Sequence, residues 1–469
     1  MPSLRVVAPA ALLDLDTVRR ELEAPGEFSA EALAEAERSA AAPRLPELDR
    51  TELPMVTIDP PGSRDLDQAL HLERTDSGFR VSYAIADVAA FVTPGGALDG
   101  ELTARGVTLY APDKRIPLHP PVLGEAAASL LPDQVRPALL WQLDLDATGE
   151  LIGTDVRRAL VRSRQRLDYM GVQAALDAGT AEPMLMLLSE IGQLRQARAR
   201  ERGAVDLPTP EQEVVLDVDG RPRLELRAQL PCEAWNAQLS LLTGIAAAAL
   251  MLRLGVGLLR TLPPADPESV QALRRSALAL GVAWPQGRSY GDVMSTLDPT
   301  LPTHAALLTL ATRLLRGAGY TAFDGAPPEQ PLHSGVAAAY AHCTAPLRRL
   351  SDRHVGEVCL AAAAGAPVPG WARQALPGLP EVMARTTRRA GALERAVVDA
   401  AEAVVLSSRV GERFDAVVVD SGRTGGVVQL ADPAVRARCE DADLRLGQAV
   451  QVVLVRADPQ ARVVLFRLA

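Results

Sequence analysis

Short apolar and β-branched runs, separated by Gly, Pro and Asp, dominate the first third of the sequence. They lie at 56–58, 69–72, 81–85 and 139–145, and this pattern favours strands joined by turns. The acid-rich stretch 144–149 stands between two strand patterns, so we expect a hairpin turn there.

Helical periodicity takes over in the middle of the chain. It covers 169–199, 233–259, most of 266–318 and about 379–410. The most apolar stretch, 241–259, contains Arg253, whose charge would cost about 2.5–3.5 kcal/mol near the centre of a membrane. We therefore expect a core helix there and no membrane span.

Residues 1–50 form a short helical N-terminal segment in this interpretation. Two helical patterns, 15–23 and 29–40, are joined by a turn, and Ser29 is placed to cap the second one. The segment is either a helix-turn-helix nucleic-acid module or an arm that packs on the core, and no basic recognition helix stands out in it.

The last sixty residues return to strands. β-Branched runs at 414–419, 426–430, 449–455 and 463–468 predict a small OB-type barrel over 409–469.

Composition narrows the function classes. A chain of 469 residues, 48% apolar and 23% charged, has room for two to four folded domains. The net charge of −9 argues against a protein that coats nucleic acid or an anionic membrane. Lys114 is the only lysine among 49 basic residues, and the arginines that make up the rest bind phosphate bidentately. Four widely spaced cysteines and the lack of a signal-peptide pattern lead us to expect a cytoplasmic protein.

The densest chemistry lies in the stretch 57–68, which contains Asp59, Asp65 and Asp67. Asp65 and Asp67 are two residues apart, so they face the same way in an extended segment. Carboxylates gathered in this way suit Mg²⁺ or Mn²⁺, and a pair of such ions can hydrolyse a phosphodiester. A solvated acidic turn paired with Arg64 explains the spacing equally well.

This turn resembles the first catalytic motif of the RNB-domain exoribonucleases, the ribonuclease II and ribonuclease R family. Further blocks of the same resemblance follow in family order, at 83–92, 98–99, 105–110, 116–117, 129–130, 167–169, 203–207, 339–349 and 393–395. The resemblance implies an α/β (α+β) RNB catalytic core over 51–405 and an all-β OB-fold RNA-binding domain over 409–469. It is closer to ribonuclease II, and fifty helical residues are too few for the family's N-terminal cold-shock domains.

The resemblance also implies an activity. It is processive 3′→5′ hydrolysis of single-stranded RNA to nucleoside 5′-monophosphates, with Mg²⁺ (or Mn²⁺), in RNA turnover or processing. RNA with a 3′ overhang next to a duplex is a further expected substrate, because the entrance would be less obstructed, and we expect a monomer without membrane contact.

The family's site maps onto this chain residue by residue. Asp59, Asp65 and Asp67 match its metal-site aspartates, and Asp65 and Asp67 are the acids assigned to catalysis. Gln68 stands where the family has a fourth aspartate, and a neutral amide is a poorer Mg²⁺ ligand than a carboxylate. Arg348 matches the catalytic arginine, whose positive charge can offset the negative charge that develops on the phosphate in the transition state.

Three more residues match substrate contacts. Tyr110 and Tyr169 match tyrosines that contact the terminal nucleotides, and Glu394 matches an acid near the RNA end. Without the surrounding motifs, each Tyr would be interpreted as half-buried core, and Glu394 and Arg348 as helix-surface residues.

Other charged groups have blander interpretations. Exposed or solvated faces are expected for two arginine sets, and hydrogen-bonded structural roles for two histidines. The sets are Arg162, Arg164 and Arg166 on a strand, which could instead line the RNA path; Arg195, Arg198 and Arg202 on a helix; and His333 and His342.

Two rival functions stay open at this point. Gln68 allows a catalytically impaired RNA-binding or regulatory protein. A phosphohydrolase of small phosphoesters is disfavoured, because an aspartyl-phosphate mechanism would want a hydroxyl residue where Gln68 and Ala69 stand.

Overall fold

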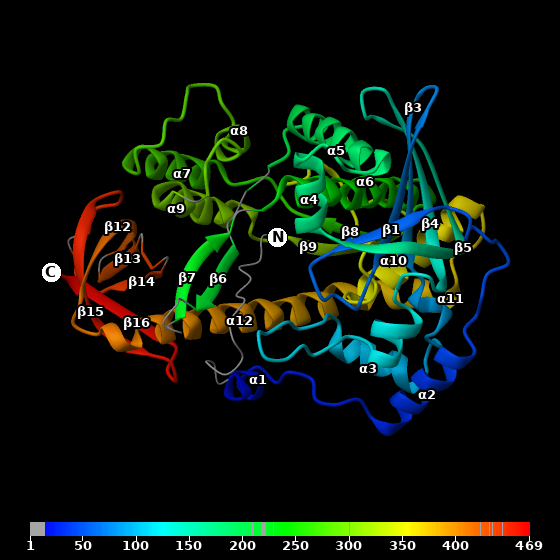
Figure 1. Ribbon diagram of the computed structural model, residues 1–469, viewed down its shortest axis with the longest axis horizontal. Helices are drawn as coiled ribbons and strands as arrows, with labels where there is room; N and C mark the ends of the chain where they lie inside the picture. The colour runs from blue at the N-terminus through cyan, green and yellow to red at the C-terminus, as the bar shows by residue number, and fades with distance from the viewer. Residues whose placement is uncertain are drawn as a thin grey trace.

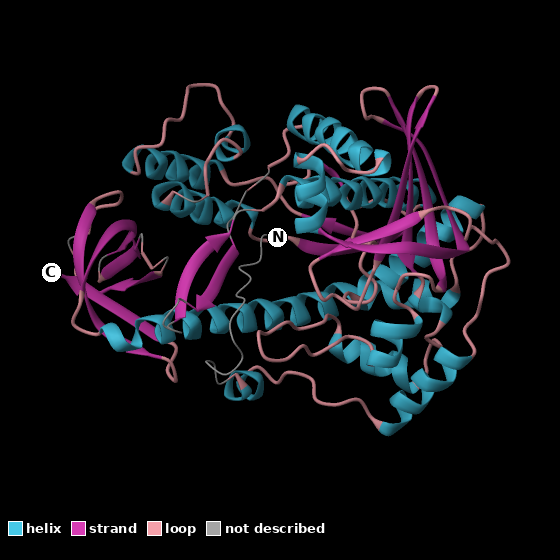
Figure 2. Ribbon diagram, viewed as in Figure 1, coloured by secondary structure: helices cyan, strands magenta, loops and turns pink. Residues whose placement is uncertain are grey.

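The computed structural model describes residues 15–469 except 206, 208–210, 217–221, 228, 300, 423, 431, 434 and 443. Within these residues the chain forms a large α/β lobe, a long helix and a terminal barrel (Figures 1 and 2). The first fourteen residues, and Asp206 of the 203–207 block, lie outside this description.

A closed five-stranded barrel is the framework of the large lobe. Its strands are β1 (Met55–Asp59), β2 (Gln68–Thr75), β3 (Gly78–Ala86), β4 (Val135–Asp146) and β5 (Leu151–Asp168). Neighbouring strands are antiparallel except β1 and β5, which run parallel and close the barrel. The strands predicted at 56–58, 69–72, 81–85 and 139–145 all lie in this barrel. The predicted hairpin joins β4 to β5, where Asp146 Oδ1 accepts from the backbone N–H of Thr148 and Glu150.

The predicted core helix is α6 (Pro231–Leu254). It is the one helix in the described part of the chain that is long and apolar enough to cross a membrane. It packs against α5 (Pro183–Glu201) and α10 (Leu350–Ala364), and its Leu239 and Leu242 are fully buried. Its apolar character is therefore explained by packing in the large lobe.

Two helix predictions need correction. The helix expected to continue to residue 259 ends at Leu254, because Gly255 adopts a φ of 78° and the chain then forms strand β8 (Val256–Thr261). The helix expected over 169–199 is two helices, α4 (Tyr169–Asp177) and α5, since Pro183 starts a new helix at its first turn.

The remaining elements lie outside the barrel. The helices are α3 (Ala97–Arg105), α7 (Pro267–Ala279), α8 (Tyr290–Met294), α9 (Pro302–Ala311), α11 (Gly370–Ala375) and α12 (Leu379–Leu406). The strand pairs are β6 (Glu211–Leu216) with β7 (Pro222–Arg227), β8 with β9 (Gly319–Asp324), and β10 (Leu332–His333) with β11 (Ala338–Ala339).

The N-terminal segment contributes α1 (Asp16–Glu21) and α2 (Ala30–Ala41). Ser29 caps α2 as predicted, its Oγ accepting from Ala32 N at 3.3 Å. α1 contacts α12, whereas α2 contacts α3, so the two helices pack on different parts of the molecule (Figure 1).

The C-terminal strands close a second barrel, which confirms the predicted OB-type fold. They are β12 (Arg413–Gly422), β13 (Gly425–Leu430), β14 (Arg436–Cys439), β15 (Ala449–Asp458) and β16 (Val463–Leu468), in the order β12-β13-β14-β16-β15. β14 was not foreseen, because four residues carry too little pattern. The barrel touches the helical layer closely: α9 contacts the C-terminal strands β12 and β13, and a Cβ on Gly447 would lie 1.9 Å from the carbonyl oxygen of Ala279 at the end of α7.

The arginine face of α5 is another correction. Arg195 was expected to be solvated, but it is 3% exposed and its Nη1 donates to Gly149 O at 2.7 Å. This face of α5 packs on the β4–β5 hairpin, so burial has replaced solvation.

Candidate active site

The carboxylate turn begins where β1 ends. Asp59 is the last residue of β1 and Gln68 the first of β2, so both lie at the same end of the barrel. The connecting loop is pinned from two sides. Ser129 Oγ accepts from Leu66 N and donates to Arg64 O, and Arg166 Nη1 donates to Ser63 O at 3.1 Å. The loop is thus held in one conformation over the barrel end.

Asp67 is the most buried acid of the turn, at 5% exposure. Its Oδ1 accepts from Leu347 N at 2.7 Å, and its Oδ2 lies 3.5 Å from Arg348 Nε. Burial raises the pKa of Asp67 to about 8; Arg348 and the Leu347 N–H oppose this rise, and Asp65 adds to it. Asp67 and Arg348, 281 positions apart in sequence, are therefore in direct electrostatic contact.

Asp59 belongs to the same electrostatic site. Burial raises its pKa to about 6, Arg348 and Arg166 oppose the rise, and Asp65 adds to it. Asp59 and Asp67 thus each interact electrostatically with both Asp65 and Arg348.

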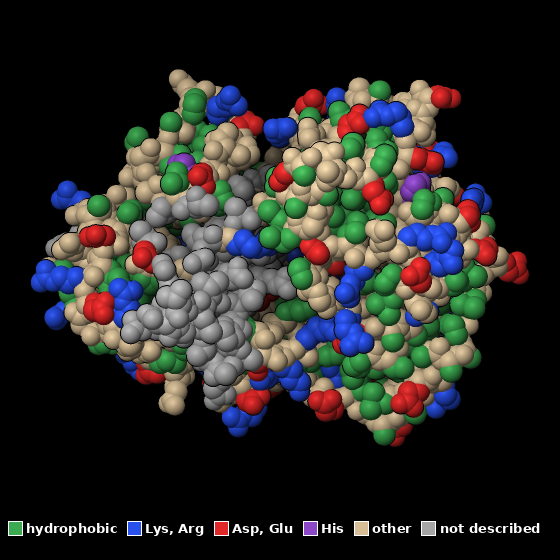
Figure 3. All heavy atoms as spheres, in the orientation of Figure 1, with side chains coloured by type: hydrophobic (Ala, Val, Ile, Leu, Met, Phe, Trp, Pro, Cys, Tyr) green, Lys and Arg blue, Asp and Glu red, His purple; other side chains and the backbone are tan. Residues whose placement is uncertain are grey.

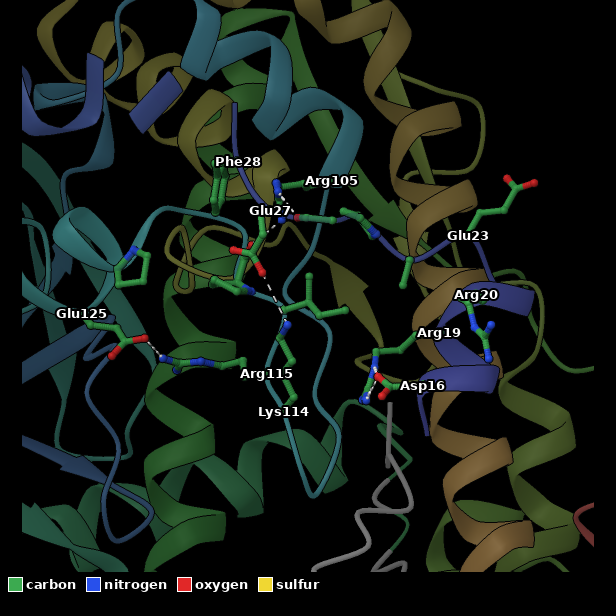
Figure 4. A pocket seen from close by; sticks show the side chains of 16 residues that line it. Asp16, Arg19, Arg20, Glu23, Glu27, Phe28, Arg105, Lys114, Arg115 and Glu125 are labelled. Atoms are coloured by element: carbon green, nitrogen blue, oxygen red, sulfur yellow. Dashed lines mark hydrogen bonds and ion pairs between the residues drawn. The ribbon is translucent and has the colours of Figure 1, made fainter. Parts of the chain in front are cut away.

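Asp65 has partners that the sequence did not indicate. Its Oδ1 lies 2.5 Å from Arg115 Nη1, and Tyr110 Oη donates to its Oδ2 at 3.3 Å. Arg115 also pairs with Glu125 through its other terminal nitrogen. Both Arg115 and Glu125 line a cavity of about 1070 Å³ against the N-terminal segment (Figure 4). Nothing in the local pattern around Arg115 distinguishes it from other loop arginines.

The side-chain partners of Gln68 are in the loop at Thr344, on β3 and on α6, and none of them is one of the three acids. Its Nε2 donates to Thr344 O at 2.7 Å, and its Oε1 accepts from Tyr83 Oη. Both polar atoms of the amide are engaged by the protein.

The aromatic candidates lie at different depths. Tyr110 is 44% exposed at the edge of the carboxylates. Tyr169 starts α4 directly after β5 and is half-buried; its hydroxyl accepts from Asn236 Nδ2 at 3.1 Å, and burial raises its pKa to about 12. Asp59 acts on Tyr169 electrostatically, which brings this tyrosine near the site.

Glu394 and Arg349 stand apart from the acids. Glu394 lies half-buried on α12, and burial raises its pKa; no hydrogen bond or ion pair joins it to the carboxylates in the described part of the chain. Arg349 pairs with the buried carboxylate of Asp352 at 2.8 Å.

His342 has the hydrogen-bonded role that we predicted, whereas the buried Nδ1 of His333 has no hydrogen-bond partner within the described residues and its ring packs edge-on against Tyr340. His342 Nδ1 lies 2.7 Å from Tyr320 Oη, and burial lowers the pKa of both His333 and His342. They are therefore neutral near pH 7.

The family resemblance implies a divalent cation, and the donor set of the turn fits one. Three carboxylates supply hard oxygen ligands, and burial disfavours the charged form of Asp59 and Asp67 in the absence of a cation. No three acidic, histidine or cysteine side chains already stand grouped as a metal cage among the described residues. Arg115 and the Leu347 N–H occupy oxygens of Asp65 and Asp67 instead.

With this geometry in view, comparison with known families identifies the chain. A model described as "RNB domain" matches residues 48–362, and one described as "RNase II-type exonuclease C-terminal S1 domain" matches 412–469. The chain belongs to the RNB family. The resemblance to the RNB family and the predicted fold class, an α/β core with a C-terminal OB-type barrel, are confirmed.

RNB relatives and structures agree with this assignment. The exosome complex exonuclease RRP44 homolog A of Arabidopsis thaliana is 30% identical over 332 residues, covering 68% of this chain and 35% of that protein. Ribonuclease R of Escherichia coli is 30% identical over 322 residues, covering 65% of this chain and 39% of its own length. This RNB chain thus spans about two fifths or less of these curated relatives.

Solved structures share the fold over nearly the whole chain. Mycoplasma genitalium RNase R, in complex with ribose methylated single-stranded RNA, superposes with a TM-score of 0.83 at 19% identity, covering 97% of this chain and 77% of that one. The same enzyme in complex with double-stranded RNA gives a TM-score of 0.81 at 20% identity, covering 97% and 82%.

Proposed function

We propose that this RNB chain is a metal-dependent 3′→5′ exoribonuclease that hydrolyses single-stranded RNA processively to nucleoside 5′-monophosphates. One observation carries the proposal: Asp59, Asp65 and Asp67 lie on one turn at the barrel end, and Asp59 and Asp67 interact electrostatically with Arg348 from a distant loop. In a solvated acidic turn Asp67 would be exposed and Arg64 would pair with an acid of the turn, whereas Asp67 is 5% exposed, its arginine neighbour is Arg348, and Arg64 lies near Glu125.

The residues divide the work of hydrolysis. Water attacks the phosphorus of the last linkage, the bond to O3′ of the preceding nucleotide breaks, and that oxygen takes up a proton. A bound Mg²⁺ or Mn²⁺ ion, held by Asp59, Asp65 and Asp67, would activate the water and neutralise the negative charge on the leaving oxygen. The Arg348 side chain, half exposed, is free to turn toward the phosphate and offset its growing charge.

Substrate contacts follow from the same geometry. Tyr110 is exposed enough to stack on a terminal base, and stacking contributes about 1–3 kcal/mol per base without sequence preference. Tyr169 and Glu394 are proposed as further contacts to the 3′-terminal nucleotides. Basic side chains gather on the large lobe, just right of the middle of the face in Figure 3, which supports an RNA path over this lobe.

The wider assignments are part of this proposal. We assign 1–50 as an N-terminal helical segment, 51–405 as the catalytic domain and 409–469 as the RNA-binding barrel. We also propose single-stranded RNA, and RNA with a 3′ overhang beside a duplex, as substrates of a cytoplasmic monomer in RNA turnover or processing.

The test is nucleotide release from poly(A) with Mg²⁺ and with Mn²⁺. We expect nucleoside 5′-monophosphates from the wild type and none from Asp67→Asn. Tight RNA binding without release by the wild type would contradict the proposal and establish an RNA-binding protein without nuclease activity. A duplex with a 3′ overhang tests the second substrate: an overhang that is not shortened would refute that part of the proposal.

A further inference from the structure

The side-chain amide of Gln68 makes three hydrogen bonds to three separate parts of the fold. Its Nε2 donates to Thr344 O at 2.7 Å, and its Oε1 accepts from Tyr83 Oη on β3 and from Ser240 Oγ on α6, the latter at 3.4 Å. Tyr83 Oη also lies 2.9 Å from Ser240 Oγ. Ser240 has a single hydroxyl hydrogen for two acceptors, Tyr83 Oη at 2.9 Å and Gln68 Oε1 at 3.4 Å, so the Tyr83 hydroxyl is the main donor to the amide oxygen.

The orientation of this amide follows from its partners. Exchanging oxygen and nitrogen would bring the amide oxygen of Gln68 against the carbonyl oxygen of Thr344, two acceptors with no hydrogen between them. The donor must therefore face Thr344. A carboxylate at position 68 has no such donor.

The loop that Gln68 binds carries Arg348. Gln68 contacts it at Thr344, and the preceding residue Asp67 contacts it at Leu347 N, three positions further along. Adjacent residues at the start of β2 thus hold the loop at two points. The turn of the loop between them is fixed by Asp352, whose Oδ2 accepts from Ala345 N at 2.8 Å.

We propose that Gln68 is a positioning residue and not a metal ligand: its amide holds the loop 344–348 so that Arg348 faces Asp67. A cation at Gln68 would have to displace the Tyr83 hydroxyl from Oε1. A second carboxylate here would add negative charge beside the buried Asp67 and repel the Thr344 carbonyl. The catalytic part of this inference rests on the proposed nuclease function.

Metal binding by the full chain tests the ligand question without any activity measurement. Mn²⁺ stoichiometry is measured by calorimetry and by electron paramagnetic resonance for the wild type, Gln68→Met and Gln193→Met. The last variant is a matched control, because Gln193 is exposed on α5. We expect the same number of Mn²⁺ ions in all three. One ion fewer in Gln68→Met alone would make Gln68 a ligand and overturn the proposal.

Single-turnover hydrolysis of a labelled oligonucleotide tests the positioning role. We expect Gln68→Met to slow the chemical step about 10- to 100-fold, as misplacement of a catalytic group does. The RNA Kd should change by no more than about threefold, since Gln68 contributes no substrate contact. Gln68→Glu, which keeps the shape and both acceptor bonds but cannot donate to Thr344, should be slowed similarly and replaces Gln68→Met if that variant does not fold. Wild-type rates in both variants would overturn the proposal.

A double-mutant cycle separates positioning of Arg348 from general loss of structure. In an Arg348→Ala background, adding Gln68→Met should change the rate by less than about twofold, because residues that act as a unit are not additive. Fully additive losses would show that Gln68 does not act through Arg348. If the wild type releases no nucleotide, the proposed function fails, and the Mn²⁺ stoichiometry still decides whether Gln68 is a ligand.

Discussion

Asp67→Asn separates what Asp67 does for the fold from what it does for chemistry. Asparagine has nearly the same shape, and its Oδ1 still accepts from Leu347 N, so the contact to the loop is kept. What is lost is an ionisable carboxyl group at a position that is 5% exposed. The substitution therefore removes a buried titratable group without creating a cavity.

The size of the stability effect follows from the pKa of Asp67. The folded protein raises it from 3.8 to about 8, so at pH 7 the folded state holds a proton that the unfolded state has lost. Keeping a carboxyl of unfolded pKa 3.8 protonated at pH 7 costs on the order of 4 kcal/mol. Asparagine bears no such cost, so the metal-free variant should be more stable than the wild type.

Thermal unfolding in EDTA at pH 7 measures this difference. We expect Asp67→Asn to raise the Tm by several degrees, with nucleotide release lost. Asp76→Asn, at an exposed turn between β2 and β3, is the matched control and should leave the Tm unchanged. A lower Tm for Asp67→Asn than for the wild type in EDTA would refute the argument that burial of the Asp67 carboxyl group destabilises the metal-free folded state at pH 7.

Further outcomes follow from the same site. In EDTA the free energy of unfolding of the wild type should fall as pH rises from about 4 to 8, because the pKa values of Asp59 (about 6) and Asp67 (about 8) are raised in the folded state. Denaturant titrations across this pH range should show the fall. Addition of Mn²⁺ should reverse it at pH 8. Arg348→Ala should lower the single-turnover rate about 10²- to 10³-fold with little change in Tm. Arg349→Ala should instead destabilise the fold by about 3–5 kcal/mol in denaturant titrations, because it leaves a buried carboxylate unpaired. Tyr110→Ala should weaken RNA binding by about 1–3 kcal/mol and change the length of the final oligomer seen on a gel.

Local patterns in the sequence were sufficient for much of the fold. Apolar and β-branched runs located the strands of both barrels except β14, and Ser29 marked the start of α2, because both signals arise within a few residues. Errors came where local signals conflict with packing. Residues 256–259 continue the apolar run of α6, but pairing with β9 makes them a strand.

The candidate site was predictable only in its local part. Asp59, Asp65 and Asp67 lie within nine residues, so their proximity needed no knowledge of the fold. The partners that define their chemistry come from far along the chain: Arg115 for Asp65, and Leu347 for Asp67. Motif spacing does not reveal contacts between residues that are far apart in the sequence. Arg348 could therefore be assigned to the site only through the family resemblance, and Arg115 could not be assigned at all.

Charge balance at the turn makes cation binding and proton release one event. Near neutral pH the folded protein keeps Asp67 largely protonated, whereas a divalent ion requires the carboxylate, so binding must expel that proton. Asp65 presents a different obstacle, because its oxygen is engaged by Arg115, which must yield for the acid to turn toward an ion. Cation affinity should therefore rise with pH, because Asp67 loses its proton. The free energy needed to break the Arg115–Asp65 ion pair lowers this affinity at every pH. Replacing Arg115 with Gln should tighten Mn²⁺ binding at every pH and leave its pH dependence in place, and calorimetric titration at two pH values would separate the two contributions.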